Sequence, residues 1–142
     1  MKLNENNALK IKLNIYKTNV AVTETDKTIK LNQYASELFA FFKIEDSDIT
    51  NQKGVFIFTK NMEPIYIGMT TQSLKKVIMT TYGSITPRNI HYDGQVTACH
   101  LSSYINKNID QIELFFIPNR DSSQIKIIKQ QLVNKYNPIL NL

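Results

Sequence analysis

The stretch that most constrains the fold of this chain is "GVFIFTKNMEPIYIGMTTQSLKKVI", residues 54–78. Residues 54–59 and 65–68 are short runs of β-branched and aromatic residues, and the Asn and Pro between them favour a turn. Residues 70–82 follow at once, with hydroxyl side chains suited to cap a helix before its apolar stripe begins. The order predicts a β-hairpin that runs directly into a helix.

The remainder of the second part alternates helical and extended patterns. It predicts a loop at residues 83–95, a helix at 97–108, a strand at 109–118 and a last helix at 121–136, for which Asp121 or a following serine is a suitable cap. Strands and helices in this order predict an α+β arrangement in layers.

The first part predicts an N-terminal extension, residues 1–53. Apolar and polar residues alternate through residues 9–15 and again at 20–22, which predicts a β-hairpin. Residues 31–44 carry apolar side chains at helical spacing and predict a helix. The polar residues 45–53 then predict a linker to a second unit, residues 54–142.

Composition predicts a folded domain with a basic second part. Of the 142 residues 42% are apolar and 20% charged, and the net charge is +5. Residues 1–50 hold seven cationic and seven acidic side chains, whereas residues 51–142 hold ten and five, so the whole excess lies there. Two interpretations stay open: a solvated surface, or a surface that binds the phosphates of a nucleic acid.

Two further features bound the location of the protein. No apolar stretch approaches the roughly 20 residues that span a bilayer, and the N-terminus lacks the apolar core of a signal peptide. We therefore expect a cytoplasmic protein without a membrane partner. The single cysteine, Cys99, leaves no disulfide framework or thiolate zinc site and is expected to be a small buried residue.

Residues Gly54 to Asn141 resemble a GIY-YIG nuclease domain. Gly54-Val55-Phe56 stands where that family has Gly-Ile-Tyr, and Tyr66-Ile67-Gly68 is an unaltered second half. The segment "GMTTQSLKK" is similar to the family's turn into its first helix, and "LVNKYNPILN" is similar to its closing pattern, which ends in Asn. The resemblance implies a small, mainly antiparallel three-stranded sheet flanked by helices, and residues 1–53 have no counterpart in it.

The resemblance also implies where a catalytic site would lie. The family hydrolyses phosphodiesters with two tyrosines on the paired strands, an arginine and often a histidine on the first helix, and a metal-binding glutamate on the last helix. Tyr66 keeps the second tyrosine, whereas Phe56 replaces the first and cannot pass a proton. Lys129 stands at the glutamate position, so the carboxylate for a divalent metal is missing.

The arginine position depends on a one-residue choice of alignment. Matching "SLKKV" to the family pattern places Val77 there, which keeps the apolar stripe in phase, whereas counting from Gly68 gives Lys76. An isopropyl group cannot stabilise a charged phosphate, and an ammonium lacks the planar fork of guanidinium. Thr81 lies one turn after Val77, so the family histidine is absent as well. His91 and Asp93, close together in a loop, are a weak alternative pair for a metal or a proton.

These positions predict a degenerate nuclease-like domain that has lost hydrolysis and acts by binding. We expect DNA or RNA backbone to be held by four cations, Lys75, Lys76, Arg88 and Lys129, with no metal site and no cofactor. Two alternatives stay open. One is an inhibitor or decoy of a nuclease or defence complex, encoded by a mobile element, with residues 1–53 and 83–95 as its protein interface. The other is a rearranged endonuclease that uses Tyr66, Lys76 and His91 with Mg²⁺ or Mn²⁺. The sequence predicts no oligomeric state.

Overall fold

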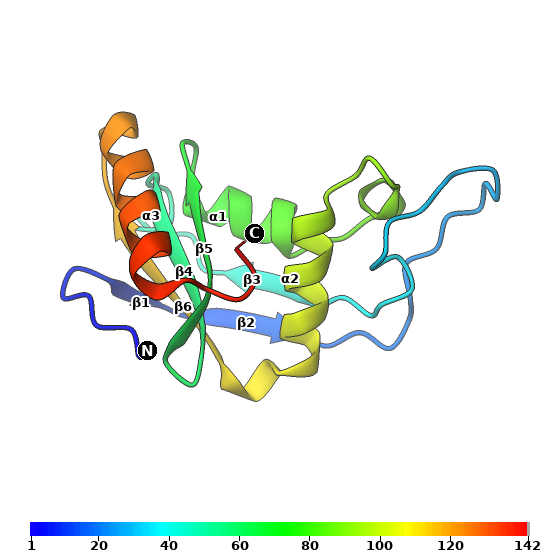
Figure 1. The fold of residues 1–142 in the computed structure, drawn as a ribbon, viewed down its shortest axis with the longest axis horizontal. Coiled ribbons are helices and arrows are strands. Elements are labelled where there is room, and N and C mark those ends of the chain that lie inside the picture. Colours follow the sequence, from blue (N-terminus) through cyan, green and yellow to red (C-terminus); the bar gives the residue numbers. More distant parts are fainter. Residues whose placement is uncertain (142) are drawn as a thin grey trace.

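The centre of the molecule is a four-stranded antiparallel sheet. The computed structural model describes residues 1–141, and Figure 1 shows this sheet nearly edge-on between helices on its two sides. In spatial order its strands are β1 (Leu9–Ile11), β6 (Ile112–Pro118), β4 (Gly54–Lys60) and β5 (Glu63–Thr70). The α+β class with mainly antiparallel sheets is confirmed. The sheet has one strand more than the three that the resemblance implies, because β1 from the N-terminal part pairs with β6.

Three segments predicted as helices in the second part are helical. Ser73 caps α1 by accepting a hydrogen bond from the Lys76 N–H, and after one α-helical turn the chain widens into a π-helix, η1. Asp121 caps the last helix by accepting from the Ser123 N–H. The helical elements are α1 (Leu74–Lys76), η1 (Val77–Tyr82), η2 (Pro87–Ile90), α2 (Val96–Lys107), η3 (Ile109–Gln111) and α3 (Ser122–Tyr136).

Strand alternation divides the core between the two faces of the sheet. One face packs against α1, η1 and α2, and its buried sheet residues include Phe56, Phe58, Tyr66, Leu114 and Phe116. The opposite face packs against α3, and its buried sheet residues are Val55, Ile57, Ile67, Phe115 and Ile117. In Figure 1, α3 lies to the left of the sheet, and α1 and α2 lie to its right. Side chains that pack beneath these helices are therefore separated by the sheet, whereas the starts of α1 and α3 meet at one end of it.

The predicted helix at residues 31–44 is wrong. Residues 41–44 form strand β3 (Phe41–Ile44), which pairs antiparallel with β2 (Leu13–Tyr16) as a separate two-stranded ribbon. Burial alternates along β3, with Phe42 and Ile44 inside the core, as a strand requires. The preceding residues form turns, in which the Asn32 side chain accepts from the Tyr34 N–H and donates to the Asn89 carbonyl. These side-chain hydrogen bonds compete with a helix.

The predicted hairpin between residues 9–15 and 20–22 is also wrong. After β2 the Thr18 hydroxyl donates to the Phe39 carbonyl, and the Thr18 N–H donates to the Asn106 side chain. The chain therefore leaves the β2–β3 ribbon instead of turning back to pair with β2. The single strand predicted at residues 9–15 is divided into β1 and β2, whose partners lie at least 25 residues away, and residues 20–22 form no strand. Period-two alternation indicated extended structure at residues 9–15 but carried no information about these distant partners.

Residues 45–53, predicted as a linker, are irregular and held in place. The buried Thr50 donates its hydroxyl to the Glu45 carbonyl, and the carbonyls of Thr50 and Gln52 accept from the first N–H groups of α1. The Lys53 carbonyl accepts from Asn119, just before α3. This segment, named here the connecting turn, therefore ties the start of α1 to the start of α3.

No helix within residues 1–141 is both long enough and apolar enough to cross a membrane.

Candidate functional site

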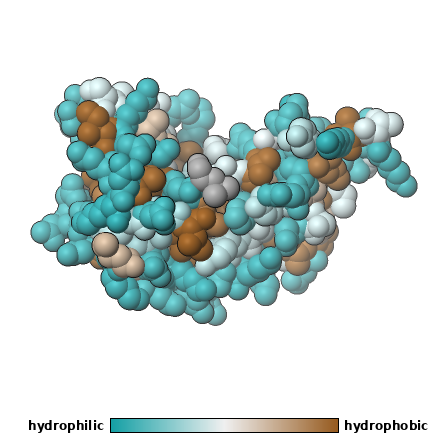
Figure 2. Space-filling model, in the orientation of Figure 1, coloured by the Kyte–Doolittle hydropathy of each residue, from teal (hydrophilic) through white to brown (hydrophobic). Residues whose placement is uncertain are grey.

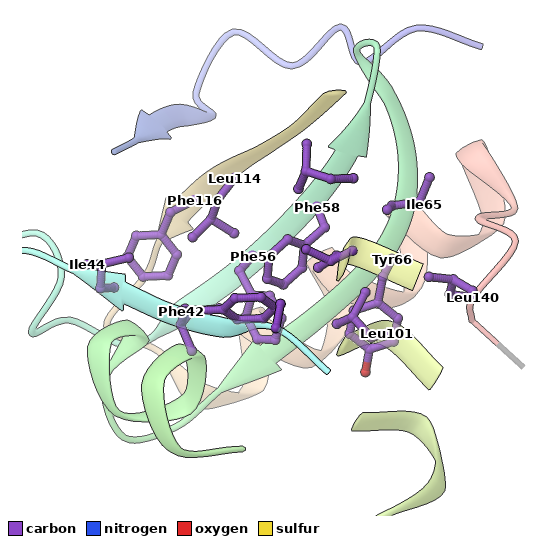
Figure 3. Packing of buried hydrophobic residues seen from close by; sticks show 14 of the residues in the cluster. Phe42, Ile44, Phe56, Phe58, Ile65, Tyr66, Leu101, Leu114, Phe116 and Leu140 are labelled. Atoms are coloured by element: carbon purple, nitrogen blue, oxygen red, sulfur yellow. The ribbon is translucent and has the colours of Figure 1, made fainter. Parts of the chain in front are cut away.

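The position of the family's catalytic tyrosines is filled by a closed aromatic cluster. Phe56 is fully buried and Tyr66 is 7% exposed. The Tyr66 hydroxyl lies 3.0 Å from the hydroxyl of Tyr82 at the end of η1, and the three ring centroids are 5.6 to 6.2 Å apart. Figure 3 shows Phe56 and Tyr66 packed against Phe58 and Leu101. The only strand phenol that matches the family is thus paired with a second phenol, Tyr82, which is partly buried against the core.

Burial keeps both phenols in the neutral form. Removal from water raises the pKa of Tyr66, although its hydrogen bond with Tyr82 acts in the other direction. The pKa of Tyr82 is raised well above 10, chiefly by burial and further by its electrostatic interaction with Tyr66. A phenol in this state donates and accepts hydrogen bonds but does not supply a base near neutral pH.

The first helix presents no guanidinium to this cluster. Val77 packs its side chain against the core beside Tyr66, which agrees with its place in the apolar stripe. Lys76 is exposed, and the side chain of Lys75 lies 3.8 Å from Asp46 of the connecting turn. Thr81 at the end of η1 is partly buried. Neither reading of the alignment therefore places an arginine or histidine next to Tyr66.

Lys129 lies on the other side of the sheet from Tyr66. It is a partly exposed residue of α3, whose buried neighbours Ile125 and Leu132 pack on the face that carries Ile67. Tyr66 belongs to the opposite face, with Leu101 of α2. The structure thus keeps Lys129 and Tyr66 in separate environments, and a group at position 129 does not share a cleft with the phenol.

The predicted pair His91 and Asp93 belongs to a chain of four polar groups. The Arg88 Nη1 donates to Asp93 Oδ1 and to His91 Nδ1, both at 2.9 Å. His91 Nε2 in turn lies 2.5 Å from Glu24 Oε2, and the hydrogen bond to His91 holds the pKa of Glu24 below its usual range. Because Arg88 is only a donor, the imidazole accepts at Nδ1 and donates to Glu24 from Nε2. This series of hydrogen bonds fixes the loop at residues 83–95 to the N-terminal part.

The four predicted phosphate-binding cations do not form one surface. Arg88 is engaged by Asp93 in the loop, and Lys129 is separated from Lys75 and Lys76 by the sheet. A different basic group surrounds the connecting turn, where β4 begins and β5 and β6 end. This group, named here the basic end, consists of Lys53, Lys75, Lys76, Arg120 and Lys126.

Local contacts hold the basic end together. The Lys53 ammonium donates to the Ser122 hydroxyl at 2.8 Å, which places it at the start of α3 beside Arg120 and Lys126. The connecting turn accepts hydrogen bonds from the first N–H groups of α1, which places Lys75 and Lys76 on its other side. Within residues 1–141, Asp46 is the one acidic side chain that forms an ion pair with this group, through Lys75. In Figure 2, hydrophilic residues cover most of the molecular surface that faces the viewer.

Two residues of this region could not be assigned from the sequence pattern. Tyr82 ends a helical segment whose widening to a π-helix brings its ring to Tyr66, and nothing in residues 70–82 marks that change. Glu24 lies 67 positions from His91, in a part of the chain without a recognisable motif. Cys99 is fully buried as predicted, and burial raises the pKa of its thiol.

Among the described side chains of residues 1–141, no group of three His, Cys, Asp or Glu residues is arranged to hold a metal ion. Comparison with protein-family models, with curated proteins and with solved structures found no match for this chain. The resemblance to the GIY-YIG family therefore stays a prediction that depends on the residues quoted above.

Proposed function

We propose that the protein is a degenerate GIY-YIG domain that binds the phosphate backbone of nucleic acids in the cytoplasm and does not hydrolyse it. Binding uses the basic end and requires no metal or other cofactor. The observation that carries the proposal is the combination of a closed phenol cluster, Phe56, Tyr66 and Tyr82, with an exposed basic surface elsewhere. In this proposal the chain keeps the fold of the family and lacks its catalytic groups.

The loss of hydrolysis is supported by the state of the phenols. A water molecule is activated by a base within hydrogen-bond reach, and Tyr66 already uses its hydroxyl on Tyr82. Burial raises the pKa of both hydroxyl groups, and Tyr66 is only 7% exposed, which limits the access of a phosphate to its phenol. Val77 and Lys129 supply neither an arginine fork nor a carboxylate for a divalent metal.

Backbone binding is supported by the position of the free cations. Lys76, Arg120 and Lys126 form no ion pair with an acidic side chain of the described chain, so their charge is available to phosphates, whereas the charge of Lys53 also acts on the Asp121 carboxylate. Each phosphate that a cation neutralises releases counterions, so affinity falls steeply with salt. Because phosphate contacts carry no sequence information, we expect little sequence preference.

The test combines binding and cutting in one sample. Labelled single-stranded and duplex DNA and RNA are incubated with the protein at low and moderate salt, with Mg²⁺ and separately with Mn²⁺. We expect binding that weakens with salt and no cleavage. Cleavage that disappears in Tyr66→Phe would overturn the proposal, because it would show that the phenol still takes part in chemistry.

Charge-reversal variants locate the surface. Lys76→Glu combined with Lys126→Glu should weaken binding of every nucleic acid at least tenfold and reduce its dependence on salt. Lys27→Glu combined with Lys30→Glu is the matched control with the same change in net charge, because both lysines are exposed in the irregular segment 17–30, which Figure 1 shows away from the sheet. Equal losses in both variants would show that only net charge matters and that the basic end is not the site.

A second candidate function is binding of a protein partner, as an inhibitor or decoy. The observation that favours it is an apolar groove of about 510 Å³ between the N-terminal part and the loop at residues 83–95, lined by Val22, Leu31 and Ile90 among others. Leu31 is 40% exposed. Co-purification of one defined partner that is lost in Leu31→Glu, without nucleic-acid binding by the parent, would favour this function.

A further inference from the structure

The outer face of the β2–β3 ribbon carries two exposed aromatic side chains directly opposite each other. Tyr16 and Phe41 are partners in the antiparallel register, and their residues are 51% and 47% exposed. The next row on the same face is Asn14 opposite Lys43. A pair of large aromatic rings in solvent on adjacent strands is a feature that the core of this domain does not require.

The inner face of the ribbon already supplies its packing. Phe42 and Ile44 are 2% and 5% exposed and belong to the core beside Phe56 and Phe116. Burial of these residues fixes the ribbon on the domain, and the alternation of the strand leaves Phe41 and Lys43 outside. Removal of the outer rings therefore leaves the main packing contacts in place.

The charges around the two rings suit a polyanion. The Lys43 ammonium lies 5.9 Å from the centre of the Tyr16 ring and forms no ion pair with an acidic side chain of the described residues. Three exposed acids, Glu45, Asp46 and Asp48, follow β3, and Glu45 lies 3.7 Å from Lys12 on the row beyond Asn14 and Lys43. The face thus combines aromatic rings, an amide and an uncompensated cation.

We propose that the outer face of the β2–β3 ribbon is a stacking platform for the unpaired bases of single-stranded nucleic acid. Exposed rings on a sheet surface stack on bases, and neighbouring lysines attract the phosphates between them. A duplex offers no free base face, so the platform selects single strands. The inference rests on the proposed function and deepens it, because it names the form of nucleic acid that is bound.

The platform and the basic end are connected along the chain. β3 ends at Ile44 and continues directly into the connecting turn, which leads to Lys53 at the basic end. We expect a single strand stacked on Tyr16 and Phe41 to continue past Lys43 toward these cations, along a path beside the acids of the connecting turn. Stacking and backbone contacts then act on one ligand, which gives single strands an advantage over duplexes of equal charge.

The test measures fluorescence anisotropy of labelled oligo-dT and oligo-U of about 12 nucleotides, within the usual range of site sizes, and of a duplex of the same length. Tyr16→Ala and Phe41→Ala should each weaken single-strand binding about tenfold and leave duplex binding unchanged, because a stacked base contributes about 1–3 kcal/mol. Comparison of the two oligonucleotides distinguishes DNA from RNA as the ligand. Tyr16→Phe, which keeps the ring, should bind like the parent.

Tyr92→Ala is the matched control. Tyr92 is 62% exposed and has the Lys30 ammonium 4.2 Å from its ring centre, but it lies in the loop at residues 83–95 rather than on the ribbon. It should bind single strands like the parent. Glu45→Gln removes the acid beside the platform and should strengthen single-strand binding. Tyr16→Leu and Phe41→Leu serve as a second pair of variants if the alanine variants fail to fold.

The outcomes separate the two proposals. Parental binding of single strands by all folded Tyr16 and Phe41 variants, together with salt-sensitive binding of duplexes, would overturn the platform and leave the proposed function standing. Absence of binding to any nucleic acid would overturn both. A change of the Tyr16 or Phe41 variants from dimer to monomer, without loss of single-strand affinity, would assign the face to self-association and overturn the platform.

Discussion

The side chain of Asn141 makes both hydrogen bonds to Ile67 that a neighbouring β-strand would make. Its Oδ1 accepts from the Ile67 N–H and its Nδ2 donates to the Ile67 carbonyl, each at 2.8 Å. The Leu140 N–H donates to the Ile65 carbonyl in the same way. β5 is an edge strand, and these bonds satisfy backbone groups that are otherwise open to pairing with another chain.

Asn141→Ala should therefore lower the free energy of unfolding by about 1–2 kcal/mol, the cost of two hydrogen bonds to the backbone. Asn141→Asp keeps the acceptor but loses the donor, and it should fall between the parent and Asn141→Ala. Urea unfolding followed by circular dichroism measures the difference. Asn134→Ala, at an exposed position of α3, should stay within about 0.5 kcal/mol of the parent. Equal stability of the Asn141 variants and this control would contradict the role in edge protection.

Gly68 is required for space rather than for backbone freedom. A glycine near the end of a strand can adopt backbone conformations closed to other residues, but no described glycine has a positive φ, and Gly68 lies inside β5. A Cβ at this position would overlap the end of the Phe56 ring, which sits in the core and is fully buried. The two residues are partners across β4 and β5.

Gly68→Ala should destabilise the protein by about 1–3 kcal/mol, the usual cost of overpacking a core. Phe56→Leu removes ring atoms at the point of overlap, so the double variant should lose less than the sum of the two single losses. Thermal or urea unfolding of the four proteins gives this coupling directly. Additive losses would mean that the ring is not what excludes a side chain at position 68.

The sequence predicted those elements whose pattern and caps are local. The hairpin of β4 and β5 and the helices α2 and α3 follow from residues within each segment, and Asp121 caps α3 as expected. The failures involve distant partners. Phe41 and Phe42 have helical spacing with Leu38 and Tyr34, yet pairing with β2 decides their conformation. The local helix preference of a segment is overridden where pairing with a distant strand buries more of its side chains.

The candidate site was predictable only as a set of positions. The replacements at Phe56, Val77 and Lys129 are evident in the sequence, but their arrangement in space is not. That Tyr66 meets Tyr82 depends on the π-helical widening of η1, and that Lys129 lies across the sheet from Tyr66 depends on which face α3 covers. Neither is encoded in a local pattern of residue types.

The contact between Glu24 and His91 predicts how the N-terminal loop is held. Glu24→Gln should loosen the attachment of this loop to residues 83–95 and speed hydrogen exchange of the Tyr92 N–H, which donates to the Lys30 carbonyl at 2.8 Å. Because the pKa of Glu24 is lowered in the folded protein, its contribution is present above pH 4.5 and is lost as the pH falls through the folded pKa. Acidification should thus speed opening in the parent more than in Glu24→Gln. Unchanged exchange at Tyr92 would argue that other contacts hold the loop.

The paired phenols predict a loss of stability at alkaline pH. Burial raises the pKa of Tyr66 and Tyr82 in the folded protein, whereas in the unfolded chain both ionise near pH 10. Their contribution is complete below pH 10 and falls as the pH rises from there toward the folded pKa values, because only the unfolded chain then releases the protons. Urea unfolding between pH 8 and 11 should show this decline in the parent.

The double variant Tyr66→Phe with Tyr82→Phe tests the cause of that decline. It removes both titrating groups and keeps both rings, so its stability should fall less between pH 9 and 11 than that of the parent. At neutral pH each single variant should cost about 0.5–1.5 kcal/mol, since it leaves one hydroxyl without its partner, and the double variant should cost less than the sum. Tyr92→Phe is the control, because Tyr92 is exposed and its loss should leave the slope unchanged. An equal decline in parent and double variant would mean that the two phenols ionise freely in the folded state. Burial would then not be what holds the two phenols in the neutral form at alkaline pH, and that support for the loss of hydrolysis would fail.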